Sequence, residues 1–251
     1  MQIYLTLLRR ELSAFFVSLA GYVIISAVTL LIGLSFVVLM TNLGDDASPM
    51  PVTEIFYSTS YFWLILLLAT PVVTMRLFAL EKATGTFETL MTTCVGDFQV
   101  VVAKFTAAMI FYTVMWLPLM ACLFIVRHFT DQPGTLDNGT LAGMYLGILL
   151  VGGLFISLGC FASALTRSQV VAAMISFVLG MALFSLGYLA KNAVPPAAQW
   201  QTSILSYFGL FDGMDDFARG VVDTRSVVFY LSLTLFFLFL TLRAVESRRW
   251  K

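Results

Sequence analysis

Charged residues are scarce in this sequence. They account for 11% of its 251 residues, whereas hydrophobic residues account for 60%. Ordinary soluble domains are about one-quarter charged and about half apolar. A chain with so little polar surface cannot hide its apolar side chains from water, so lipid is expected to surround much of it.

Histidine and cysteine are also rare. The only histidine, His128, is expected to be an interfacial polar residue, and the three cysteines are Cys94, Cys122 and Cys160. Neither their number nor their spacing supports a metal site or a disulfide framework. The net charge of zero leaves no basic stripe of the kind that binds phosphates, which argues against nucleic acid as a partner.

Six stretches are apolar enough to cross the roughly 30 Å hydrocarbon core, which requires about 20 residues each. They cover residues 21–40, 56–75, 105–126, 141–165, 170–189 and 227–242. None carries an Asp, Glu, Lys or Arg well inside it. The first lacks the features of a cleaved signal peptide. The sequence therefore predicts an all-α membrane protein with a single domain of six transmembrane helices.

The basic residues indicate how these spans are oriented. If both termini are cytoplasmic, only Arg127, Lys191, Arg219 and Arg225 fall on the outer side, and all other Lys and Arg residues fall inside. Most acidic residues show the reverse distribution. This positive-inside bias predicts a multi-pass protein of the bacterial inner membrane with cytoplasmic termini.

Residues 1–17 have an amphipathic helical pattern. The apolar face carries Tyr4, Leu5, Leu8, Leu12, Phe15 and Phe16, and the polar face carries Gln2, Thr6, Arg9, Arg10 and Ser13. Such a helix can lie along the inner leaflet. The alternative is the surface helix of a soluble subdomain, but the chain offers no other soluble segment for it to pack on.

The longest cytoplasmic stretch, residues 76–104, contains helix-breaking residues. Gly85 can end a helix that extends from the second span, and Thr86 can cap a short helix with Glu88 in its first turn. Gly96 can then close this helix, and Asp97 can cap the third span. The pattern predicts a short helix parallel to the membrane, although a simple connecting loop remains an alternative.

The outer segment, residues 190–226, is too polar and too interrupted to form a full span. Pro195 and Pro196 end the fifth span, and the apolar run 204–211 is too short to cross the membrane. This run either dips into the membrane where protein buries its backbone or lies on the outer leaflet.

The fourth span is rich in small residues, which allow close approach of helix backbones. They are Gly143, Gly147, Gly152, Gly153, Ser157 and Gly159. Tight packing within one subunit is favoured over a place in a dimer seam or a substrate path. Pro71 and Pro118 are expected to kink their helices.

Three segments resemble those of a known family. Arg76-Leu-Phe-Ala, then Glu81-Lys82 and Thr84-Gly-Thr-Phe-Glu-Thr-Leu90, is similar to the cytoplasmic signature of ABC-2-type permeases. The opening Arg9-Arg10-Glu11 with the following apolar residues resembles the amphipathic elbow helix of that family. Tyr207-Phe208 and the segment 217–223 resemble the subgroup of gliding-motility permeases.

This resemblance implies a mechanism. Permeases of this kind form dimers, and each short cytoplasmic helix docks on a separate ATPase that binds ATP and Mg²⁺. The resemblance places this coupling contact at Glu81, Lys82, Gly85, Thr86, Phe87, Glu88, Leu90 and Met91, flanked by Arg9, Arg10 and Glu11. It further implies an exporter, a re-entrant hairpin over residues 190–226, and an accessory extracytoplasmic protein as a further partner.

The chain itself has no Gly-rich P-loop, so no ATP hydrolysis or cofactor is expected on it. Two other functions are weighed against the permease. An ion-coupled secondary transporter would normally place ionisable residues within its spans, and none is expected there. An intramembrane serine protease would need a base beside Ser157, and His128 is distant in sequence. The sequence does not identify the transported substrate.

The charge asymmetry predicts the topology directly. Cys94 should react with a membrane-impermeant thiol reagent only from the cytoplasmic side, and a tag at Lys251 should be accessible from that same side. Labelling of Cys94 in intact cells would contradict the predicted orientation.

Overall fold

The computed structural model describes residues 2–45, 56–57, 60–87, 96–129, 138–191 and 210–247. Within these ranges the structure is helical and contains no strand, which confirms the predicted all-α class. The helices are α1 (Gln2–Phe16), α2 (Leu19–Asp45), α4 (Ser60–Thr74), α5 (Ala79–Thr84), α7 (Asp97–Met115), α8 (Leu117–Phe129), α9 (Asn138–Leu165), α10 (Gln169–Lys191), α12 (Leu210–Ala218) and α13 (Thr224–Glu246).

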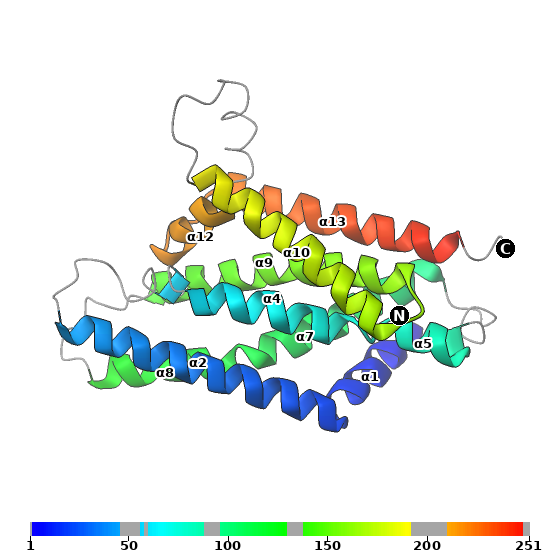
Figure 1. The fold of residues 1–251 in the computed structure, drawn as a ribbon, viewed down its shortest axis with the longest axis horizontal. Helices are drawn as coiled ribbons and strands as arrows, with labels where there is room; N and C mark the ends of the chain where they lie inside the picture. Colours follow the sequence, from blue (N-terminus) through cyan, green and yellow to red (C-terminus); the bar gives the residue numbers. More distant parts are fainter. Residues whose placement is uncertain are drawn as a thin grey trace, which may run out of the picture.

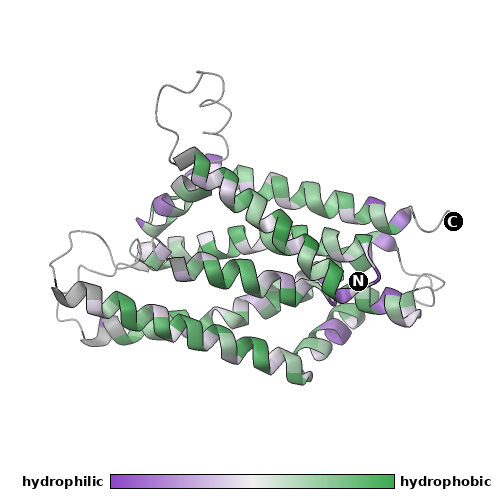
Figure 2. Ribbon diagram, viewed as in Figure 1, coloured by the Kyte–Doolittle hydropathy of each residue, from purple (hydrophilic) through white to green (hydrophobic). Residues whose placement is uncertain are grey.

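Six helical stretches are long and apolar enough to cross a membrane, as the sequence predicts. They are α2, α4 with α5, α7 with α8, α9, α10 and α13. Figure 2 shows hydrophobic residues along most of their length, with hydrophilic residues gathered mainly near the ends. The short helices α1 and α12 lie at opposite ends of the bundle (Figure 1).

The helix of the third span begins at Asp97, where the sequence predicts a helix cap, so Lys104 lies within α7. The apolar helix Asp97–Ile125 has 29 residues and is about 44 Å long, which exceeds the roughly 30 Å hydrocarbon core. Its first turns can therefore extend beyond the hydrocarbon. The helix is interrupted at Trp116, near the kink expected from Pro118.

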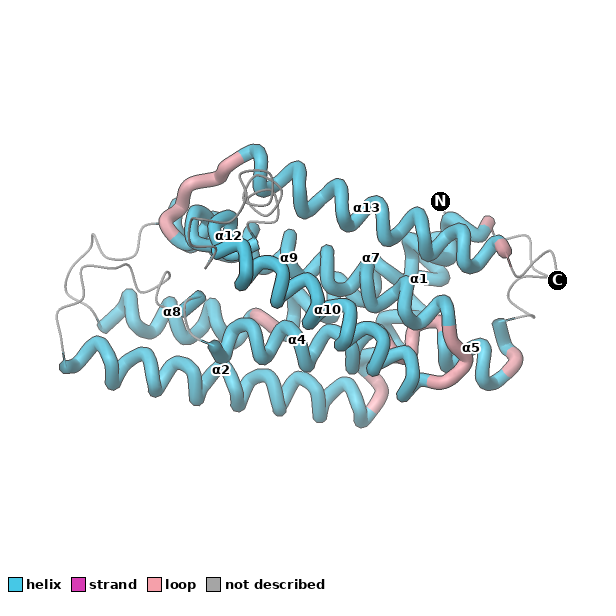
Figure 3. Tube along the Cα trace, turned by 45° about the horizontal axis from the view of Figure 1, so that its top comes forward, coloured by secondary structure: helices cyan, strands magenta, loops and turns pink. Residues whose placement is uncertain are grey.

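Helix α9 lies at the centre of the bundle. It packs against α4, α7, α10, α12 and α13 and is the most buried of the six spans. By contrast, α2, α10 and α13 expose much of their apolar surface, as expected of helices that face lipid or another subunit. Both termini, α1 and α5 lie near one end of the bundle (Figures 1 and 3).

The glycines of α9 allow its neighbours to approach closely. A Cβ added at Gly152 would overlap the Tyr112 ring, and one at Gly159 would overlap the Thr74 side chain. At Gly147 it would lie 3.0 Å from the Cβ of Phe217, on α12. All these contacts are made within one chain. They agree with the interpretation that the small residues serve packing inside the subunit.

The described part of the outer segment forms α12. Its apolar residues Leu210, Met214 and Phe217 are buried, and the Tyr230 hydroxyl on α13 donates to the Leu210 carbonyl at 2.9 Å. Gly220, with φ of 79°, adopts a left-handed conformation suited to glycine and turns the chain toward α13. Residues 204–209 lie outside the described residues. The re-entrant hairpin stays a prediction.

The close contact at Gly159 generates a testable prediction. Gly159→Ala should lower stability by about 1–3 kcal/mol, because the added methyl must displace the Thr74 side chain or separate α4 from α9. Thermal unfolding of the detergent-purified protein would measure this loss. Gly153→Ala is the matched control on the same helix, because its added Cβ would meet Met109 at 3.7 Å, an ordinary contact. Equal unfolding temperatures for the two variants would contradict the packing argument.

Candidate functional site

Helix α1 is anchored on α7 by aromatic and polar contacts. Phe15 stacks on Phe111 with ring centroids 4.9 Å apart, and Phe16 contacts the same ring edge-on at 5.5 Å. Farther along α1, the Tyr4 hydroxyl donates to the Thr106 hydroxyl at 3.1 Å. The amphipathic pattern of residues 1–17 therefore places part of its apolar face on the protein, and other residues such as Ile3 and Leu5 stay exposed.

A turn separates α4 from α5, and Ser163 on α9 stabilises it. The backbone N–H groups of Phe78 and Ala79 donate to the Ser163 oxygen, both at 3.1 Å. The Ser163 hydroxyl donates in turn to the Met75 carbonyl at 3.2 Å. One side chain thus satisfies backbone groups that a continuous helix would have paired internally.

Helix α5 ends at Gly85, which has φ of 75° and forms the left-handed C-cap. This agrees with the role that the sequence suggests for Gly85. Thr86 and Phe87 are helical again after Gly85. The Thr86 hydroxyl lies 2.9 Å from the Thr84 hydroxyl and 3.4 Å from the Glu81 carbonyl. The residues that a Thr86 cap would contact lie outside the described residues, so this cap stays a prediction.

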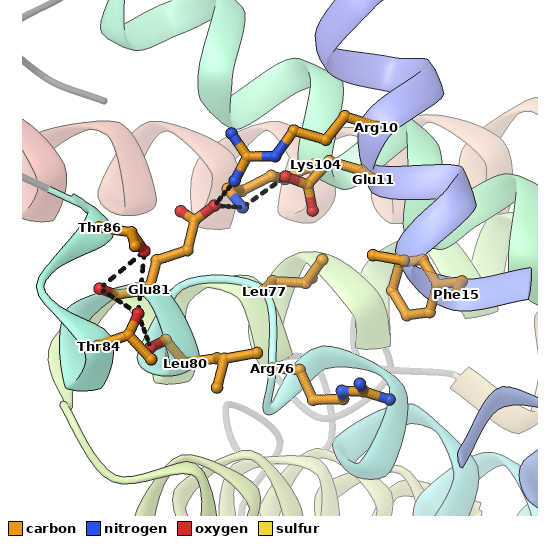
Figure 4. Close-up of a pocket in the computed structure, with 11 residues that line it drawn as sticks. Arg10, Glu11, Phe15, Arg76, Leu77, Leu80, Glu81, Thr84, Thr86 and Lys104 are labelled. Carbon is orange, nitrogen blue, oxygen red and sulfur yellow. Dashed lines mark hydrogen bonds and ion pairs between the residues drawn. The ribbon is translucent and has the colours of Figure 1, made fainter. Parts of the chain in front are cut away.

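Four charged side chains from α1, α5 and α7 form an ion-pair network, shown in Figure 4. The Lys104 ammonium lies 2.9 Å from Oε1 of Glu11 and 3.0 Å from Oε1 of Glu81. The Arg10 guanidinium donates to the same Glu81 oxygen at 2.8 Å. The Lys104 side chain is only 2% exposed, and those of Glu81 and Glu11 are 10% and 12% exposed.

The network balances two cations against two carboxylates. A buried ammonium is costly unless it is paired, and Lys104 has two carboxylates within ion-pair distance. This pairing explains how a lysine can lie in the first turns of a span. Residues 105–126 carry no charge, as expected, and Lys104 lies just before them in α7, where partners from α1 and α5 compensate its charge.

Lys82 connects α5 to a different part of the bundle. Its ammonium donates to the carbonyl of Ala164, in the last turn of α9, where a cation suits the negative end of the helix dipole. It also lies 5.2 Å from the centre of the Phe87 ring. The adjacent residues Glu81 and Lys82 thus hold α5 between the α1–α7 pair and the end of α9.

The predicted site residues are only partly brought together. Arg10, Glu11, Glu81 and Thr86 line one pocket, and Lys82, Gly85 and Phe87 lie on the same short segment. Arg9 is exposed on α1 and does not line the pocket. Glu88, Leu90 and Met91 lie outside the described residues. The proposed roles of all these residues in coupling stay predictions.

Three residues of this region, Lys104, Arg76 and Ser163, were not among the site residues predicted from the sequence. A signal existed for Lys104, because an ionisable residue at the edge of an apolar run needs a partner. Arg76 belongs to the recognised signature and lines the same pocket. Ser163 had no distinguishing signal, since a serine in a span also commonly bonds its own helix.

The surroundings of Ser157 argue against an intramembrane serine protease. Ser157 is fully buried, and its hydroxyl donates to the Leu154 carbonyl of its own helix at 2.7 Å. A nucleophilic serine would instead be positioned by a neighbouring base. In the described ranges, no group of three or more His, Cys, Asp or Glu residues could hold a metal ion.

Comparison with known proteins identifies the family. The model of the ABC-2 family transporter protein matches residues 48–244, which include five of the six spans. A search of curated proteins found no match. The matched region covers most of the sequence and carries the α5 segment and the central helix α9. The chain therefore belongs to the ABC-2 family of transporter membrane proteins.

Proposed function

We propose that this ABC-2 family permease works as an exporter in the bacterial inner membrane, driven by a separate ATPase. The ATPase docks at the end of the bundle where α1, α5 and the start of α7 meet. Family membership supports a role as the membrane subunit of an ABC transporter. The observation that supports the docking position is the ion-pair network around Lys104.

The network offers a mechanical path from the docking surface to the spans. The segment after Gly85 is the proposed contact for the ATPase, and Glu81 fixes the preceding helix to Arg10 on α1 and to Lys104 on α7. Lys82 fixes the same helix to the end of α9. A displacement of this segment would therefore be passed to α7 and to the central helix.

The charge distribution supports the proposed orientation. Described bases at the end of the bundle with the termini include Arg10, Arg76, Lys82, Lys104 and Arg243. Described acids at the opposite end include Asp215, Asp216 and Asp223. By the positive-inside rule, the end with the termini is the cytoplasmic one, where an ATPase and its ATP are available.

The partners of the proposed complex include a second permease copy. The exposed apolar faces of α2, α10 and α13 offer surface for the second copy as well as for lipid. Membership of the gliding-motility subgroup, a re-entrant outer hairpin and an accessory extracytoplasmic protein belong to the same proposal and rest on the sequence resemblance.

Replacement of Lys104 should impair transport but leave binding of the ATPase intact. Lys104→Met leaves Glu11 and Glu81 buried with only Arg10 as a neighbouring cation, so stability should fall by about 3 kcal/mol. The ATPase should still copurify, but the amount of cargo moved per ATP should fall several-fold. These quantities would be measured on the purified complex in proteoliposomes, with a fluorescent cargo that the wild type transports.

Arg243→Gln is the matched control. It removes a cation at the same end of the bundle, but the Arg243–Glu246 pair is exposed, with 64% and 34% of the side-chain surfaces accessible. Exposed pairs contribute little to stability, so this variant should behave as the wild type. Unchanged cargo per ATP in Lys104→Met would contradict the proposed mechanical path.

The energy source separates this proposal from an ion-coupled transporter. The permease alone should show no transport under an imposed proton or sodium gradient, and the complex should transport only with hydrolysable ATP. A protonophore should leave the ATP-driven flux largely intact, whereas vanadate should stop it. Gradient-driven flux through the permease alone, without any ATPase, would refute the assignment.

A further inference from the structure

A pocket of about 250 Å³ opens between α1 and the α4–α5 turn. This equals the volume of roughly eight liquid water molecules at about 30 Å³ each. Its walls combine charged residues with apolar side chains, among them Phe15, Leu77 and Leu80 (Figure 4). It is therefore an amphipathic pocket, with room for a group of several non-hydrogen atoms.

Glu81 lines this pocket, and one oxygen of its carboxylate accepts no hydrogen bond from the described residues. Oε1 receives both Arg10 and Lys104, whereas Oε2 is buried and has no hydrogen-bond partner within the described chain. Glu81 as a whole is 8% exposed. A buried carboxylate oxygen without a donor is unfavourable, so a ligand that supplies an N–H or O–H group would be stabilised there.

Arg76 supplies a cation to the same pocket. Its guanidinium donates to the Ser18 hydroxyl, with both nitrogens at 3.3 Å, and it forms no ion pair with a carboxylate of the described residues. The other charges that line the pocket, Arg10, Glu11, Glu81 and Lys104, balance one another. Arg76 is thus the positive group available to an anion.

We expect the pocket to lie near one surface of the membrane. Ser18 immediately precedes α2, Arg76 follows the end of α4, and the two side chains are in contact. Basic pockets between helices at the cytoplasmic surface are a common setting for phospholipid headgroups. The apolar wall of Phe15, Leu77 and Leu80 suits the glycerol and upper acyl region of such a lipid.

We propose that this pocket binds a phospholipid with a primary ammonium headgroup, such as phosphatidylethanolamine. The lipid phosphate pairs with Arg76, and the ammonium donates to Oε2 of Glu81. Both contacts are charge-assisted hydrogen bonds, which are stronger than neutral ones. The bound lipid joins the α4–α5 turn to α1. This proposal concerns the membrane subunit alone and does not depend on ATPase coupling.

Phosphatidylcholine is a suitable comparison ligand. It has the same phosphate and the same net charge, but its quaternary ammonium has no N–H to donate to Glu81. The wild-type permease, purified into nanodiscs that contain equal amounts of the two lipids, should retain phosphatidylethanolamine on the order of tenfold over phosphatidylcholine. Native mass spectrometry of the protein released from the nanodiscs would count the retained lipids.

Variants of the two polar contacts should change this retention in different ways. Arg76→Gln should reduce retention of both lipids, because both use the phosphate contact. Glu81→Gln should abolish the preference between them, because its Nε2 cannot accept from the ammonium. Arg243→Gln, at the same end of the bundle but outside the pocket, should retain lipids as the wild type does.

Equal retention of the two lipids by the wild type would overturn the proposal and would leave Glu81 Oε2 to a donor from a protein partner. Wild-type retention by Arg76→Gln would overturn it as well. If Glu81→Gln fails to fold, the lipid comparison on the wild type and the Arg76 variant still decide the question. An excess of soluble glycerophosphoethanolamine should compete only weakly, because it lacks the acyl chains that the apolar wall contacts.

Discussion

The burial of the Lys104 ammonium is the constraint on which one end of the bundle, where α1, α5 and α7 meet, depends. A lysine that is 2% exposed in a span requires compensating carboxylates, and Glu11 and Glu81 provide them from two other helices. The pairing fixes α1 and the short helix α5 against α7 at the same time. Without it, α5 would lose its link to α7 and would keep the Arg10–Glu81 pair, the α4–α5 turn and the Lys82 contact.

The α5 segment is consequently held at several points, and the chain changes direction after it at Gly85. Ser163 stabilises the turn that precedes it, Glu81 and Lys82 hold its two sides, and Gly85 ends it with a left-handed residue. Its contacts reach α7 and α9, and in our proposal they carry the movement of the ATPase to these helices. In our proposal, a phospholipid binds in the amphipathic pocket beside Glu81, between α1 and the α4–α5 turn.

The membrane part of the fold relies on close helix packing. Water does not drive association between apolar helices in lipid, so small residues and good contact must do so. Gly152 and Gly159 let Tyr112 and Thr74 pack directly on the backbone of α9. The central helix therefore touches most of the bundle, while α2, α10 and α13 keep exposed apolar faces.

The sequence by itself determined the properties that are local along the chain. Apolar runs of sufficient length predicted six spans, Gly85 predicted the end of α5, and the cytoplasmic signature around Glu81 predicted the family. The tertiary structure alone decided which charges meet. Glu11 and Lys104 are separated by 93 residues, and Arg10 and Glu81 by 71, so no local pattern could pair them. The sequence therefore predicted no partner for Lys104, because the carboxylates that compensate its charge lie on other helices.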